Sequence, residues 1–216
     1  MPTTKRFLVP YLLFLVIFIA GAVDPLLTML HGVQQPEGSG GISPAGLVTG
    51  LISLVAGVAA VLLLARGKPV RQAIASVMLA VSVLSWPLAV VPLKAVATGG
   101  NIMLVVALSQ VLSAVLFFLL LSAWVVAASH APWMFAVAVI ATIANIVLSG
   151  VVGVVASGTV AALQASSGVL ATSVALPALV KIVIFTGVVL VGRYMTAGAP
   201  NTDGGSGFSA SDRIGW

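Results

Sequence analysis

The chain has 216 residues, of which 61% are hydrophobic and 6% are charged, against about 45–50% and about 25% in soluble domains. Nine basic and four acidic residues cannot solvate a globule of this size, so the composition excludes an ordinary soluble domain and predicts an integral membrane protein. The basic residues behind the net charge of +5 lie singly or in short groups, a pattern that argues against a nucleic-acid interface.

Six apolar segments are long enough to cross a bilayer, which takes about 20 residues per helix. They are residues 7–30, 44–65, 70–93, 102–128, 132–156 and 174–194, separated by clusters of Gly, Pro, Ser, Asn and charged residues. The predicted fold class is therefore all-α, a polytopic membrane helix bundle over residues 1–195. The Gly/Ser-rich residues 196–216 are expected to form a flexible tail.

The first segment has features of a secretory signal, with Lys5 and Arg6 before an apolar run and small residues at 20–22. We expect it to remain as an uncleaved anchor. Asp24 and Pro25 follow, a pair typical of a helix N-cap and first helical residue. This pair predicts that the first helix breaks at Asp24 and that a short outer turn follows.

The second segment carries small residues at spacings of four, three, four and three, which place them on one face of a helix. These residues are Gly46, Gly50, Ser53, Gly57 and Ala60. Small residues let helix backbones approach closely in lipid, so we expect a helix interface here, either inside the subunit or between subunits.

The fourth and fifth segments contain the most polar side chains that are not charged. They are Ser109, Gln110 and Ser113 in the fourth segment, and Asn145 and Ser149 in the fifth. A buried amide facing lipid is costly, so Gln110 and Asn145 should each face another helix or a wet cavity. Two interpretations remain open: interhelical hydrogen bonds that hold the bundle together, or a solute site between these segments.

Two connections are expected on the outer side of the membrane. Residues 32–43 are polar and Gly-rich, and residues 157–173 are too polar for a span but have apolar residues enough for a short interfacial helix.

The sixth segment contains Lys181, which lies about 10 Å inside the outer boundary when the segment is counted back from Arg193. A lysine at this depth is costly if it faces lipid. Three interpretations remain open: an ion pair with Asp24 from a neighbouring first helix, a binding site for an anionic ligand or lipid, and snorkelling of the side chain toward the headgroups.

The placement of Lys and Arg predicts the orientation. If the N-terminus is cytoplasmic, that side holds seven basic residues, Lys5, Arg6, Arg66, Lys68, Arg71, Arg193 and Arg213, and the other side holds Lys94. The positive-inside rule therefore predicts that both termini are cytoplasmic.

Catalytic constellations are missing from the sequence. His31 and His130 are expected on opposite sides of the membrane, and the four carboxylates do not pair within it. With no cysteine, no metal site, cofactor or enzymatic activity is predicted.

The leading functional hypothesis is a non-catalytic accessory subunit that packs within a larger membrane complex. Its expected partners are the lipid bilayer and other membrane subunits or copies of itself, with no nucleic acid. The alternative is a transporter or binding component for a small solute or lipid, with its site between segments four, five and six. The expected location is a prokaryotic-type plasma membrane.

Overall fold

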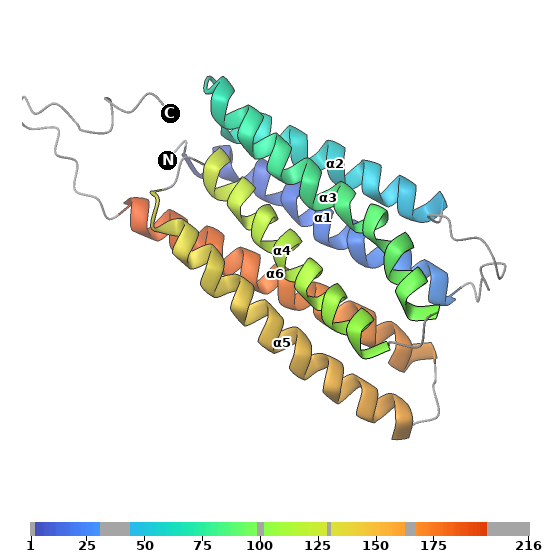
Figure 1. Ribbon diagram of the computed structural model, residues 1–216. Helices are drawn as coiled ribbons and strands as arrows, with labels where there is room; N and C mark the ends of the chain where they lie inside the picture. Colours follow the sequence, from blue (N-terminus) through green and yellow to red (C-terminus); the bar gives the residue numbers. More distant parts are fainter. Residues whose placement is uncertain (1–2, 31–43, 99–101, 129–130, 163–166, 198–216) are drawn as a thin grey trace, which may run out of the picture.

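A computed structural model describes residues 3–30, 44–98, 102–128, 131–162 and 167–197, and these ranges form six α-helices (Figure 1). The helices are α1 (Thr3–Leu30), α2 (Pro44–Leu64), α3 (Pro69–Thr98), α4 (Ile102–Ala127), α5 (Met134–Ala162) and α6 (Ser167–Ala197). The predicted all-helical class is confirmed. The outer connection 32–43 and residues 198–216 of the tail lie outside the described residues.

Four of these helices contain segments long and apolar enough to cross a membrane: Gly46–Leu64, Ala107–Ala127, Met134–Val152 and Ala175–Tyr194. Among the residues whose side chains are described, α1 and α3 contain shorter apolar segments, Phe7–Val23 and Pro69–Ser85. Lipid tails offer no hydrogen-bond partners, and a helix pairs its backbone N–H and C=O groups within itself. The protein is therefore a helical membrane bundle.

Two predicted boundaries are wrong. The helix of α1 continues through Asp24 and Pro25 to Leu30 instead of breaking there. In addition, α5 runs on to Ala162 and α6 begins at Ser167, so most of residues 157–173 extends the two long helices instead of forming a loop with a separate short helix. Ala and Leu in this stretch favour continued helix, and it contains no proline.

The connection between α2 and α3 shows how a tight helix end is built. Gly67 has a φ of 81°, a left-handed conformation that glycine adopts without steric cost. Pro69 then occupies the start of α3, where its missing N–H is not needed. The Gln72 side chain donates a hydrogen bond of 3.3 Å to the Leu62 carbonyl, which satisfies one of the free acceptors at the end of α2.

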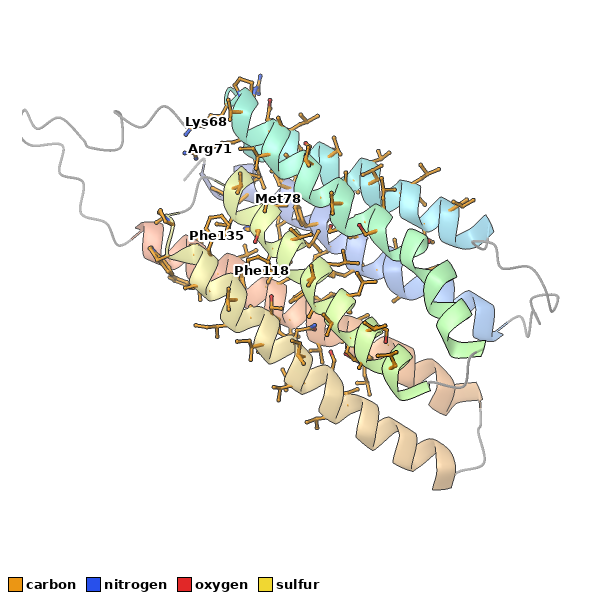
Figure 2. All side chains as sticks on the ribbon, viewed as in Figure 1. Lys68, Arg71, Met78, Phe118 and Phe135 are labelled. Carbon is orange, nitrogen blue, oxygen red and sulfur yellow. The ribbon has the colours of Figure 1, made fainter. Side chains whose placement is uncertain are left out.

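The six helices form a closed ring in which each contacts the next along the chain, and α6 returns to contact α1. Consecutive helices run in opposite directions, so the start of α1, the α2–α3 turn and the end of α6 lie at the same end of the bundle (Figure 1). This end, here called the basic end, carries Arg66, Lys68, Arg71 and Arg193. Lys68 and Arg71 lie there together where α3 begins (Figure 2).

Aromatic side chains from α1, α4 and α6 fill the middle of the ring. Phe185 packs against Phe14 at 5.6 Å and against Trp124 at 5.3 Å between ring centroids. Phe14 and Trp124 meet edge to face at 5.0 Å. All three side chains are fully buried. Edge-to-face pairs are worth about 0.5–1.5 kcal/mol beyond the area that they bury, so this cluster is the centre of the core.

Among the described side chains, the buried ones extend to about the same level on each helix. Counting away from the basic end, the last buried side chains that the structure describes are Ala20, Ser53, Ser82, Leu116, Asn145 and Phe185. At 1.5 Å per residue they lie about 14–20 Å along the helix axes from the ends of the apolar segments. Beyond them the described side chains are partly or fully exposed. We call this part of the bundle the distal half; its helix ends spread apart at the lower right of Figure 1, most clearly α5.

Candidate functional site

Lys181 lies on the face of α6 that points into the ring. It precedes Phe185 by four residues and Val188 by seven, and these spacings place all three residues on one helical face. Phe185 and Val188 are buried in the core. Lys181 is therefore directed toward the interior, one turn farther from the basic end than the aromatic cluster.

The four carboxylates of the chain, Asp24, Glu37, Asp203 and Asp212, all lie outside the described side chains. Lys181 is partly buried, and within the described part of the chain its ammonium group makes no hydrogen bond or ion pair. A cation held among apolar helices is costly without a partner or water. Lys181 therefore requires a partner, water or a lipid headgroup.

The predicted neighbour of Lys181, Asp24, lies on a helix that does contact α6. The contact between α1 and α6 is confirmed by the Tyr11 hydroxyl, 2.9 Å from the Thr186 hydroxyl, and by the packing of Phe18 on Phe185. Counted from these two contacts at 1.5 Å per residue, Asp24 lies about 3–12 Å from Lys181 along the helix axes. The Asp24 side chain is not among those described, so the ion pair stays a prediction.

The polar residues of α4 follow the same face as its aromatic residues. Gln110 precedes Phe117 by seven residues, and Ser113 precedes it by four. Phe117 is buried, whereas Ser113 is partly buried and Gln110 is exposed. Ser109 is partly buried and has an interaction within the structure. The expectation that Gln110 faces another helix or a wet cavity stays a prediction.

The polar residues of α5 also face inward. Asn145 is 3% exposed and continues the buried face of Ala138 and Ala141. One turn farther, the Ser149 hydroxyl donates to the Asn145 side-chain oxygen over 3.4 Å. Thr142 donates to the Ala138 carbonyl at 2.8 Å. These two bonds stay within α5, and both interpretations of the polar residues, interhelical hydrogen bonds or a solute site, stay predictions.

The small-residue stripe of α2 is divided between two environments. At Gly57, a Cβ atom would lie 2.5 Å from a methyl of Leu79 on α3 and 3.0 Å from one of Ile17 on α1. Ala60 and Ser53 are buried as well. At Gly50, by contrast, a Cβ atom would meet nothing within 4 Å. The part of the stripe near the basic end is therefore an interface inside the chain, between α2 and its two ring neighbours.

The sequence analysis did not predict the aromatic cluster around Phe185. Its signal was present in the spacing of Tyr11, Phe14 and Phe18 along one face of α1, and in the seven-residue spacing of Phe117 and Trp124 on α4. The hydrogen bond between Tyr11 and Thr186 has a defined direction. Thr186 donates its own proton to the Ile182 carbonyl at 2.7 Å, so the Tyr11 hydroxyl is the donor to Thr186.

Within the described residues, no group of three or more His, Cys, Asp or Glu side chains is close enough to hold a metal ion. The remaining chemistry consists of one ammonium group, neutral amides and hydroxyls, beside aromatic rings. Such groups can bind a solute through charge and hydrogen bonds.

Comparisons of the chain with protein-family models, curated proteins and solved structures find no match.

Proposed function

We propose that this membrane protein binds a small anionic solute between α4, α5 and α6, and that the site serves its uptake or transfer across the membrane. The observation that carries the proposal is Lys181, a partly buried cation on the face of α6 that also carries the buried Phe185 and Val188. An ionisable residue within a membrane bundle marks a functional site by default, because its cost must be offset by a specific interaction.

Polar residues on α4 and α5 support a site rather than a structural lysine. Asn145 and Ser149 of α5 and Ser113 and Gln110 of α4 occupy inward-facing positions in or beside the distal half. Their amide and hydroxyl groups are hydrogen-bond donors, which suit the oxygens of an anion. The partial exposure of Lys181 and the exposure of Gln110 give a solute access from the end opposite the basic end.

The orientation that goes with this proposal follows from charge. Arg66, Lys68, Arg71 and Arg193 share one end of the bundle, and the positive-inside rule assigns that end to the cytoplasm. Both termini are then cytoplasmic and the Lys181 region faces the outer side, as expected in a prokaryotic-type plasma membrane.

The accessory-subunit hypothesis has less support than the sequence suggested. It rested in part on small-residue stripes available to partners, and the close approach at Gly57 is used inside the chain. A Cβ atom at Gly50 would meet nothing within 4 Å, so a helix of another subunit could pack there. The test below distinguishes this possibility.

The test is binding of organic anions to the purified protein in nanodiscs, measured by isothermal titration calorimetry. Lys181→Met should weaken binding at least about tenfold, since a charge-assisted contact is worth about 1.5–3 kcal/mol. The matched control is Lys68→Met, an exposed lysine at the basic end, which should bind as the unaltered protein does. Equal binding by the Lys181 variant would overturn the proposal. Absence of anion binding together with stoichiometric co-purification of another membrane protein would favour the subunit hypothesis.

A further inference from the structure

We infer that the connection between α2 and α3 binds an anionic phospholipid, with Arg66 and Arg71 at the phosphate and exposed apolar side chains of the two helices against the acyl chains. This lipid site lies at the basic end, whereas Lys181 lies about 18 Å along α6 from Arg193. It therefore goes beyond the proposed function and does not depend on it.

The two arginines lie where the apolar span of α2 ends. That span ends at Leu64, and Arg66 follows two residues later. At the same end of the bundle, Trp133 before α5 is 43% exposed and Tyr194 on α6 is 74% exposed. Trp and Tyr are enriched at the depth where lipid headgroups meet hydrocarbon. These positions place Arg66 at the level of the lipid phosphates.

A tight connection holds the two arginines close in the chain and on adjoining helix ends. The Gln72 side chain ties the first turn of α3 to the Leu62 carbonyl in the last turn of α2 over 3.3 Å. Arg66 is exposed and Arg71 is partly buried. Lys68 lies beside Arg71 where α3 begins (Figure 2). Three cationic side chains thus share one short turn at the membrane surface.

The chemistry of these side chains suits a phosphate without an attached cation. A guanidinium group presents N–H donors in a fork that matches two phosphate oxygens. Phosphatidylcholine carries a trimethylammonium group beside its phosphate, and Lys68 would repel it. Phosphatidylglycerol carries the same phosphodiester with a neutral glycerol. Basic residues next to a membrane span attract anionic lipids in this way.

Exposed apolar side chains lie on the membrane side of the two arginines. Leu62 precedes Arg66 by four residues and Ile74 follows Arg71 by three, so each lies about one helical turn farther into the membrane. Leu62 is 48% exposed and Ile74 is 44% exposed, and α2 contacts α3. The acyl chains of a lipid held at the turn would lie along this surface. A free phosphate ion has no apolar part to bury there, which favours a phospholipid.

The test is native mass spectrometry of the full chain in detergent, titrated with lipids that share their acyl chains and differ in their headgroups. We expect phosphatidylglycerol to bind at least about tenfold more tightly than phosphatidylcholine, which is about 1.4 kcal/mol. Glycerophosphoglycerol, the same headgroup without acyl chains, should bind at least about a hundredfold more weakly than the lipid. Equal affinities in either comparison overturn the inference.

Two double variants locate the site. Arg66→Gln with Arg71→Gln should lower the preference for phosphatidylglycerol over phosphatidylcholine at least about fivefold. The matched control is Lys5→Gln with Arg6→Gln, which removes the same charge from α1 at the same end and should leave the preference unchanged. An equal loss for both would reveal a general attraction of the basic end and overturn a site at the turn. Because each readout is a ratio of two affinities in one variant, a general loss of folded protein does not change it.

The carboxylates of the tail could compete for the same arginines. Asp203 and Asp212 lie outside the described residues, so a third variant tests them in the full chain. Asp203→Asn with Asp212→Asn should leave the preference for phosphatidylglycerol unchanged. If this variant alone shows the preference, the tail occupies the turn in the natural protein and the lipid site is wrong.

Discussion

The half of the bundle next to the basic end and the distal half differ in how their inward faces are filled. Near the basic end, the inward faces carry Phe14, Trp124, Leu121 and Ala138, all fully buried. In the distal half, the same faces carry Lys181, Ser149 and Gln110, which are partly or fully exposed. One helical stripe thus changes from packing residues to polar residues at a common depth.

The largest expected effect tests the packed half. Trp124→Ala removes the edge-to-face contacts to Phe14 and Phe185 and leaves a cavity among fully buried rings. We expect a loss of about 3–5 kcal/mol in the free energy of unfolding. Denaturation by sodium dodecyl sulfate in mixed micelles measures it.

The control for this variant is Val111→Ala on the same helix. Val111 is 62% exposed, so the change should stay within about 0.5 kcal/mol. Similar losses for both variants would contradict the comparison between a packed half and an open half.

The second prediction uses two glycines of α2 that lie seven residues apart. Gly57→Ala places a methyl group against Leu79 and Ile17, and overpacking of this kind costs about 1–3 kcal/mol. Gly50→Ala enters free space in the distal half, so the stability should be unchanged or slightly higher. The same mixed-micelle denaturation measures both variants. A larger loss of stability for Gly50→Ala than for Gly57→Ala would contradict the tight helix interface at Gly57.

The third prediction concerns Asp24 and Lys181. If the two charges pair, Asp24→Asn and Lys181→Met each leave the other charge without a partner, and the double variant is milder than the sum. A paired Asp24 and Lys181 would give a coupling of about 1 kcal/mol in the free energy of unfolding, measured by a double-mutant cycle. Strictly additive effects of the two substitutions would exclude the ion pair and favour the proposed binding role of Lys181.

The smallest expected effect is at the hydrogen bond between α1 and α6. Tyr11→Phe removes the donor to Thr186, and Thr186→Val removes the acceptor. Interhelical bonds of this kind average about 0.6 kcal/mol in membranes, so a double-mutant cycle should give a coupling of that size. A coupling near zero would leave the aromatic packing of Tyr11 on Phe185 as the main contact here.

Sequence reasoning located the helices well where a helix begins or ends at a strong local signal. Pro44 opens α2 and Pro69 opens α3, within one residue of the predicted starts. Helix boundaries were predicted less accurately where hydropathy was the only signal. The stretch 157–173 was judged too polar to span, yet polarity decides membrane depth and not helix formation. Similarly, the prediction at Asp24 and Pro25 followed a capping preference that the surrounding helix overrides.

The candidate site was predictable in its residues but not in its arrangement. Lys181, Asn145 and Gln110 stand out in an apolar sequence because each is costly in lipid. Their shared depth, the exposure of Gln110 and the aromatic cluster beside Lys181 depend on how α4, α5 and α6 are rotated and spaced.

The sequence by itself determined that this protein is a membrane helix bundle with a basic end, because span length and charge placement are local properties read by the bilayer. Only the tertiary structure decided which face of each helix is interior. In lipid, the outward and inward faces are equally apolar: Val183 is 68% exposed and Val188 is buried, yet they are the same residue type on one helix. The ring closure between α1 and α6 therefore selects the inward face, and with it places Lys181 inside the bundle.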